Sequence, residues 1–266
     1  MNEYRFLEKD HVHQLFDGQE WRCLIGTSTA VGVLHKELTY WASGMALGNF
    51  GWINSKLSSK DQCIKSAEEA LTKIKTMSVG DYLNLLTDSY HAHRKKKESS
   101  AKTGSSNHEL METYINEAIS GKSHLTIPDI VKPFDTWASK NVKQFLGSEL
   151  HTFSKKLWVG GILDFLYIDK DDKLVLGDFK STKTSPYFNQ WLQVGGYDYQ
   201  CQELGKAFDL DGNPVLTLDK PIDYHAIFSF SVGLDKPFFN HNVEMAKRGF
   251  SHCVEIYRDK MLFERR

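Results

Sequence analysis

The chain has 266 residues, a formal net charge of -1 at pH 7 and 25% charged residues, which are ordinary values for a globular protein with a sizeable core. The balanced charge gives no global sign of a nucleic-acid partner, so such a partner has to be recognised from local patches. The N-terminal stretch MNEYRFLEKDH has no apolar signal core, and no run reaches the ~18 apolar residues of a membrane span. These features predict a cytoplasmic protein with no membrane partner.

In the first part of the chain the hydrophobic spacing predicts helices. The expected helices cover residues 30–47, 61–77, 79–97, 108–120 and 134–146. The stretch ESSAKTGSSN, residues 98–107, is expected to be a loop that ends in a capping residue, Asn107.

The second part of the chain changes to the pattern of strands. Strands are expected at residues 157–168, 174–180 and 224–232, and helices at 187–204 and 242–263. This order predicts an α+β fold, with a central mixed sheet flanked by helices. The expected domains are a mainly helical region, 1–125, that serves as a cap or binds DNA, and a core, 126–266; one compact domain is the alternative.

The four cysteines argue against a metal cluster. Cys23, Cys63, Cys201 and Cys253 are far apart and contain no CxxC pair, whereas zinc and iron–sulfur sites usually use closely spaced cysteines. A disulfide framework is also unusual in a chain of this length, which favours a reducing compartment. We therefore expect no iron–sulfur cluster.

Two carboxylates stand in apolar surroundings on either side of a predicted hairpin. Asp164 lies within GILDFL and Asp178 within LGDFK, and the turn DKDDK between the strands is centred on Asp171. A symmetric hairpin places the two acids directly opposite each other, with Cβ atoms roughly 4.5–5.5 Å apart. Such a pair is unfavourable, and burial increases the cost. A shared proton or a divalent cation would relieve it, and two carboxylates suit Mg²⁺ or Mn²⁺.

Lys180 adds a cation to this acid pair. Side chains alternate along a strand, so Asp178 and Lys180 share a face while Phe179 points to the other. A lysine beside a metal can position a water or neutralise the charge that develops on a phosphate. The alternative is a buried salt bridge between Asp164 and Lys180 without a catalytic role.

Three motifs follow one another: GILD (161–164), GDFK (177–180) and QVGGY (193–197). This order resembles the PD-(D/E)XK nuclease superfamily, in particular its RecB-like and phage-type exonuclease branch, which reads G-x-x-D, (D/E)-x-K and Q-x-x-x-Y. The stretch GSSNHE (104–109) is similar to the branch's G-x-x-x-H-E motif, and Glu149 stands where the branch has an acid before the G-x-x-D strand. The resemblance covers residues 104–200, and 27–41 loosely.

The resemblance implies a metal-dependent DNA exonuclease with a restriction-endonuclease-like core. The implied metal ligands are Asp164, Asp178, the main-chain carbonyl of Phe179, His108 and Glu149, with Mg²⁺ or Mn²⁺ as the cofactor. The implied catalytic residues are Asp164, Asp178, Lys180, Gln193 and Tyr197, the last two sharing a helix face because they are four apart. As alternatives, His108 is a cap or surface histidine, Glu149 an ordinary acid before a strand and Tyr197 a packing residue. Some members of the branch hold an iron–sulfur cluster through cysteines that this chain lacks.

A basic run, HAHRKKK at residues 91–97, precedes the His108 motif. Such a run is usually a solvated face, but next to a phosphate-cleaving centre it predicts contacts with a nucleic-acid backbone. The expected contact residues are Arg94, Lys95, Lys96, Lys97 and Lys183, with Lys155 and Lys156 as extensions. Trp41, Trp52 and Trp191 are expected either to stack on bases or to belong to the core.

The expected partners are DNA with an end and, in a bacterial or phage-infected cell, a single-strand-annealing or recombination protein. Three other functions stay open at this point: an endonuclease of the same fold, a non-catalytic nucleic-acid-binding module, and a metal-free structural domain. The sequence leaves open the polarity of digestion, the preferred strand type, the choice of DNA or RNA, and the oligomeric state.

Overall fold

The computed structural model describes residues 3–34, 39–54, 58–122, 126–182 and 185–264, with the side chains of 39–41 and 97–103 excepted. The chain forms two compact units: a sheet unit, Met1–Leu34 with Ser106–Arg266, and a helical unit, His35–Ser105. This division differs from the boundary expected at residue 125. The reason is long-range pairing, because β4 (Ile25–Gly26) joins β6 (Val159–Asp169) as a parallel neighbour and so ties the N-terminal segment to the sheet.

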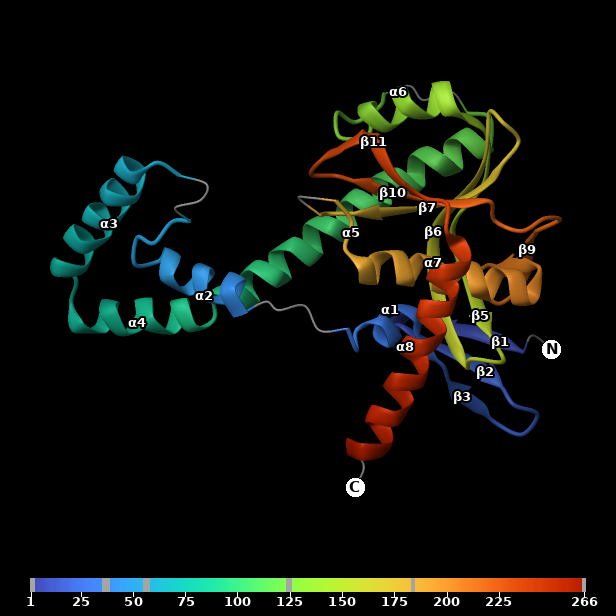
Figure 1. Cartoon of the computed structure of the whole chain (residues 1–266), viewed down its shortest axis with the longest axis horizontal. Coiled ribbons are helices and arrows are strands. Elements are labelled where there is room, and N and C mark those ends of the chain that lie inside the picture. The colour runs from blue at the N-terminus through green and yellow to red at the C-terminus, as the bar shows by residue number, and fades with distance from the viewer. Residues whose placement is uncertain (1–2, 35–38, 55–57, 123–125, 183–184, 265–266) are drawn as a thin grey trace. The chain divides into compact units, whose positions relative to one another are not determined.

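The sheet unit is built on a mixed sheet of eight strands among the described residues (Figure 1). The strand order is β11-β10-β7-β6-β5-β8-β9, with β4 paired to β6 beside this path. The strands not yet given are β5 (Val142–Ser154), β7 (Leu174–Lys180), β8 (Lys206–Phe208), β9 (Pro214–Thr217), β10 (Tyr224–Ser229) and β11 (Gly233–Asn240). β10 runs parallel to β7, while β5, β6 and β7 are antiparallel neighbours. The predicted class, a mixed sheet flanked by helices, is confirmed.

One face of the sheet carries an aromatic core beneath α5 (Ala92–Ile119) and α6 (Lys132–Asn141). Phe134 of α6 meets Phe165, Phe179 and Phe228 from three strands, with ring centroids 5.2–5.7 Å apart. All four rings are buried. Contacts of this kind fix the height of α5 and α6 over the sheet.

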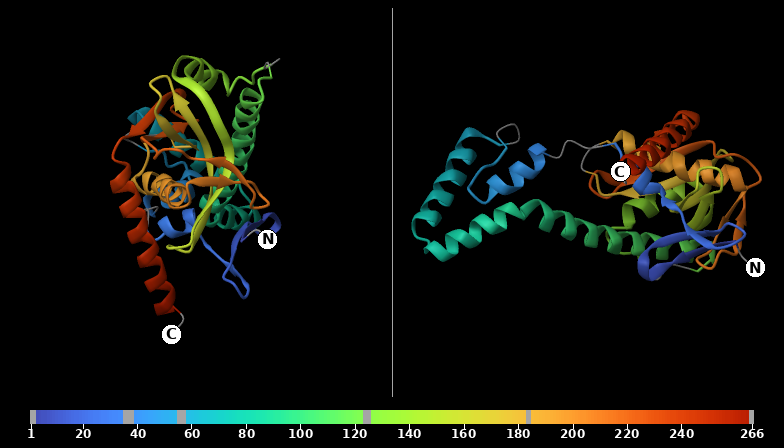
Figure 2. Two further views of the ribbon diagram at one scale, coloured as in Figure 1. Left: turned by 90° about the vertical axis from the view of Figure 1, so that its right-hand side faces the viewer. Right: turned by 90° about the horizontal axis from the view of Figure 1, so that it is seen from below.

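The other face lies beneath α7 (Phe188–Leu204), and α8 (Val243–Glu264) crosses α7 on the outside (Figures 1 and 2). The helices approach closely at Gly195, where an added Cβ would lie 2.5 Å from the Ala246 carbonyl carbon. A side chain at this position would push the two helices apart. α1 (Thr27–Val31) packs into the same layer through Ala30 and Val31.

The N-terminal residues form strands and not the mainly helical region expected for 1–125. β1 (Tyr4–Leu7), β2 (Val12–Phe16) and β3 (Trp21–Cys23) make an antiparallel three-stranded sheet, with a short 3-10 helix, η1 (Glu8–Asp10), between the first two. Tyr4 is buried and stacks on Phe153 of β5, with ring centroids 4.7 Å apart. These three strands are too short for their alternating apolar residues to predict a strand from sequence alone. They form against the main sheet, which their apolar side chains cover.

The helical unit contains α2 (Thr39–Gly48), α3 (Lys60–Lys75), α4 (Val79–Tyr90) and the first part of α5. α3 matches the helix expected at 61–77 closely, whereas the helix expected at 79–97 is interrupted, because α4 ends at Tyr90 and α5 begins at Ala92. The helix expected at 30–47 is described only as α1 and α2, since residues 35–38 lie outside the description. The loop expected at 98–107 is helical and continues into the His108 segment. Glycine and serine are weak helix formers but do not stop a helix as proline does, and this stretch has no proline.

The helix expected at 134–146 ends at Asn141, and β5 begins at Val142. β5 pairs with β6 along almost its whole length, so sheet pairing overrides the helical pattern of residues 142–146. Among the described residues, no helix combines the length and the apolar character needed to cross a bilayer.

Candidate metal centre

Three acids fall in one row across three neighbouring strands. β6 and β7 pair with Phe165 opposite Gly177 and Leu166 opposite Leu176, so the next position in this register sets Asp164 opposite Asp178. β5 and β6 pair with Ser148 opposite Phe165 and Leu150 opposite Leu163, which sets Glu149 opposite Asp164. The hairpin register therefore follows the symmetric turn that the sequence predicts. The recorded β6–β7 pairing stops just before the two aspartates.

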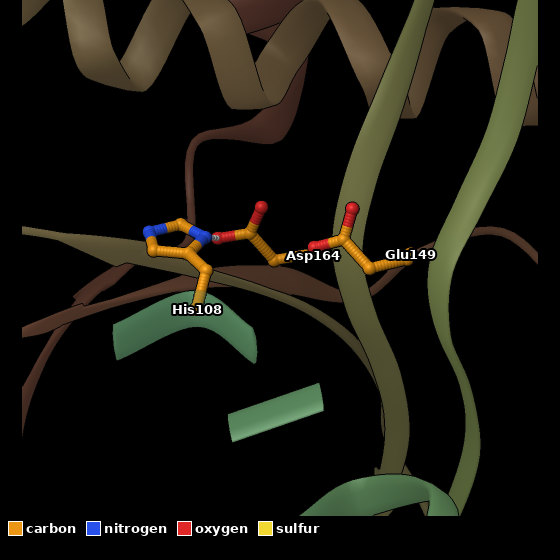
Figure 3. Close-up of side chains that lie close together, drawn as sticks. All are labelled: His108, Glu149 and Asp164. Atoms are coloured by element: carbon orange, nitrogen blue, oxygen red, sulfur yellow. Dashed lines mark ion pairs between the residues drawn. The ribbon is translucent and has the colours of Figure 1, made fainter. Parts of the chain in front are cut away.

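A histidine from α5 completes a compact cluster with two of these acids. One ligand atom each from His108, Glu149 and Asp164 lies within 4.8 Å of the others. Asp164 stands between the other two, and its Oδ2 is 3.6 Å from His108 Nδ1 (Figure 3). The side chains come from β5, β6 and α5, so the cluster exists only because α5 lies over this end of the sheet.

Asp164 also holds the backbone of the next strand. Its Oδ2 accepts a hydrogen bond from the Phe179 N–H at 2.6 Å. In an extended strand the N–H and C=O of one residue face the same neighbouring strand, so the Phe179 carbonyl, the expected ligand, also lies on the β6 side. The Phe179 ring turns into the aromatic core and is 6.0 Å from the His108 ring.

Asp178 and Lys180 form a tight pair next to the cluster. Lys180 Nζ lies 2.8 and 2.7 Å from Oδ1 and Oδ2 of Asp178. Asp178 is 1% exposed, and its Oδ2 has no partner of hydrogen-bond geometry among the described residues despite that short ion pair. Lys180 therefore forms its ion pair with Asp178. The alternative from the sequence, a buried salt bridge between Lys180 and Asp164, is not what the structure has.

Burial is the main cause of the unusual pKa values in this centre, and neighbouring carboxylates add to it. Burial, with the charges of Asp164 and Glu112 adding to it, raises the pKa of Glu149 from its ordinary 4.5 to about 8. Burial also raises the pKa of Asp178, and Asp164 adds to this rise while Lys180 opposes it. Glu149 moreover has a left-handed backbone, with φ 49°, which costs a non-glycine residue free energy and occurs often at functional sites.

Lys180 keeps its proton in this setting. Burial lowers its pKa, but the carboxylates of Asp178 and Asp164 raise it by more, so the net pKa lies above the ordinary value. The ammonium group is therefore a fixed positive charge and a hydrogen-bond donor, and not a base.

The motif on α7 lies against the same group of side chains. Gln193 Nε2 donates to the Tyr197 hydroxyl at 2.8 Å, as their spacing on one helix face predicts. Tyr197 is 6% exposed and packs in the core under α7, so the packing role is present as well. Burial raises its pKa above the ordinary range, which keeps the phenol neutral.

Two further side chains lie in this region, and the sequence motifs did not predict either of them. The charge of Glu112 contributes to the raised pKa of Glu149. Glu112 lies one helical turn after His108, on the same face of α5. The i, i+4 spacing of His108 and Glu112 is the signal that could have identified it. Phe230, after β10, packs beside the His108 ring with centroids 5.8 Å apart.

The residues expected to bind nucleic acid belong mostly to the helical unit or lie outside the described residues. Arg94, Lys95 and Lys96 are exposed on the part of α5 that belongs to the helical unit. The Lys97 side chain and all of Lys183 lie outside the described residues, as does the Trp41 side chain. Lys155 pairs with Glu3, Trp191 of α7 packs partly buried against the core between α7 and the sheet, and Trp52 lies against Gly44.

The donor set suits a divalent cation. Glu149 and Asp164 offer carboxylate oxygens and His108 an imidazole nitrogen within one cluster, while the oxygens of Asp178 lie against Lys180. A cation would favour the charged form of Glu149, which burial and the neighbouring carboxylates disfavour. No family model matches the chain, and no curated protein matches it either.

Mn²⁺ affinity is expected to rise with pH across the pKa of Glu149, by up to ~10-fold per pH unit below about pH 8. Below that pKa the carboxyl holds a proton that has to leave before the oxygen can bind a cation. Calorimetry in two buffers of different ionisation heat should detect proton release at pH 7 and little at pH 9.

The variant Glu149→Gln should abolish this proton release. Glu255→Gln, at an exposed position of α8 outside the motifs, is the control and should leave it unchanged. Equal proton release by the wild type and Glu149→Gln would show that another group titrates.

Proposed function

We propose that this chain is a metal-dependent nuclease that hydrolyses DNA phosphodiester bonds, most effectively from an end. The observation that carries the proposal is the arrangement of His108, Glu149 and Asp164 within one ligand shell, with the Asp178–Lys180 pair on the adjacent strand. A row of acids that is so costly without a cation needs a function to explain it.

Each side chain has a task that follows from its contacts. His108, Glu149, Asp164 and Asp178 would hold Mg²⁺ or Mn²⁺, and the bound cation would supply Lewis-acid activation of a water and of the phosphoryl oxygen. Asp178 fixes the Lys180 ammonium group at 2.7–2.8 Å, so its charge is already oriented when a phosphate arrives. The lysine then donates to the phosphate oxygens as negative charge builds up on them.

Gln193 and Tyr197 support this arrangement from α7. The Gln193 amide is oriented by its hydrogen bond to the buried Tyr197 hydroxyl, so its own oxygen is fixed for a contact with the substrate or with Lys180. The preference for a DNA end comes from the motif resemblance and not from the geometry.

Lys180→Ala is expected to lower Mn²⁺-dependent cleavage of end-labelled linear DNA by about 100-fold or more, because charge stabilisation at the phosphate is lost. Lys170→Ala, in the exposed turn of the same hairpin, should cleave like the wild type. Full cleavage by Lys180→Ala would reject the assigned chemistry.

Covalently closed circular DNA tests the requirement for an end. An exonuclease leaves it intact, whereas nicking or linearisation by the wild type would show an endonuclease. Wild-type protein that binds DNA and no divalent cation would instead be a non-catalytic binding module.

A further inference from the structure

The helical unit exposes an unusual amount of apolar surface. Among its described side chains, no apolar one is buried. Its exposed large apolar residues are Leu47, Trp52, Ile64, Leu71, Val79, Tyr82, Leu83, Leu86 and Tyr90. Soluble monomers seldom leave so many apolar side chains in water, so this surface calls for a partner that covers it.

The apolar side chains of α4 form one stripe. Val79, Leu83, Leu86 and Tyr90 follow the i, i+4, i+7, i+11 spacing of a single helix face and are 78%, 57%, 41% and 76% exposed. Tyr82, 38% exposed, lies at its edge. The exposed parts of these side chains make a patch on the order of 500 Å², at the upper end of what a typical monomer exposes.

Positive charge stands at both ends of this stripe. Lys73 and Lys75 occupy the last turn of α3, just before α4. His93, Arg94, Lys95 and Lys96 are exposed in the first turns of α5, just after it. The polar face of α4 is acidic in contrast, with Asp81 exposed and Asp88 paired to Lys95 at 2.7 Å.

We propose that the α4 stripe docks an amphipathic helical segment of another protein that carries acidic residues at its ends. Aliphatic side chains at helical spacing fit the apolar face of such a helix, and the cations at each end fit its acids. The sequence predicts nucleic-acid contacts for the basic run; the stripe adds an apolar requirement that a nucleic acid does not meet.

The charges disfavour the other occupants. Two copies paired through the stripe would bring their lysine-rich ends together whichever way the helices run. An anionic bilayer prefers a helix with a basic polar face, whereas that of α4 carries Asp81 and Asp88. Single-stranded nucleic acid prefers aromatic over aliphatic contacts, and three of the four stripe residues are aliphatic.

The test uses the full chain and a labelled synthetic 20-residue peptide with leucines at helical spacing and glutamates at both ends. A control peptide has the same composition and scrambled leucines. The variant Leu83→Gln/Leu86→Gln should weaken peptide binding about 10-fold, measured by fluorescence anisotropy. Both positions are exposed, so the variant should keep the wild-type melting temperature.

Leu71→Gln, 55% exposed on α3, is the matched control and should bind the peptide like the wild type. The proposal would be overturned if the wild type bound both peptides equally well, or if the double variant bound the leucine peptide as tightly as the wild type does. A wild-type protein that is dimeric while the double variant is monomeric would also overturn it. So would weaker binding of the double variant than of the wild type to oligo-dT or to phosphatidylglycerol vesicles. None of these readouts depends on nuclease activity, so the outcome is independent of the proposed function.

Discussion

Asp164→Asn is expected to lower metal-dependent DNA cleavage by about 1000-fold or more, corresponding to ~4 kcal/mol of transition-state stabilisation. Asp164 stands between His108 and Glu149 (Figure 3), and its charge adds to the raised pKa of both other acids, Glu149 and Asp178. The asparagine keeps an oxygen that can accept the Phe179 N–H bond, so the local backbone should be preserved. Cleavage of end-labelled DNA and calorimetric Mn²⁺ binding should fail together.

Asp171→Asn is the matched control, since Asp171 is an exposed acid in the turn of the same hairpin. It should bind Mn²⁺ and cleave DNA like the wild type. Loss of cleavage by Asp164→Asn with unchanged Mn²⁺ binding would place the cation elsewhere, and a melting temperature far below that of the wild type would show a structural effect instead.

Gly177→Ala is expected to lower the free energy of unfolding by ~3 kcal/mol, because the position opposite Phe165 has no room for a methyl group. An added Cβ would lie 2.1 Å from Phe165 Cζ. The Phe165 ring cannot move aside, because it is fully buried and stacks on Phe179 with centroids 4.8 Å apart. The glycine of GDFK is therefore required by the aromatic layer that supports the site. Urea unfolding of the variant and the wild type would measure the loss of stability.

A double variant tests the cause of this loss. Phe165→Leu removes the obstructing ring, so Gly177→Ala should cost clearly less in that background than in the wild type. Gly80→Ala, where the only neighbour of an added Cβ is the Ser78 hydroxyl at 3.8 Å, should instead change stability by no more than ~1 kcal/mol. Additive costs for the Phe165 and Gly177 changes would show that the clash is not the cause.

Some predictions that depend on neighbouring residues along the chain agree with the structure, while the helix expected at 134–146 ends at Asn141. β7 covers the expected residues 174–180, and α7 and α8 begin within one residue of their expected starts. The symmetric turn DKDDK gives the observed β6–β7 register, because a short hairpin leaves its strands little freedom to slide. The helix through 98–107 shows the limit of such reasoning, since composition alone does not decide between a loop and a weak helix that continues on both sides.

The sequence by itself determined the β6–β7 register, whose next position sets Asp164 opposite Asp178, that Lys180 shares the Asp178 face and that Gln193 meets Tyr197, because these relations follow from turn symmetry, strand alternation and helical spacing. Only the tertiary structure decided that His108 and Glu149 join Asp164, with Glu112 nearby, and that Lys180 pairs with Asp178. His108 lies 56 positions before Asp164, and contacts over such separations depend on how α5 and β5 pack against the sheet, which no local pattern encodes.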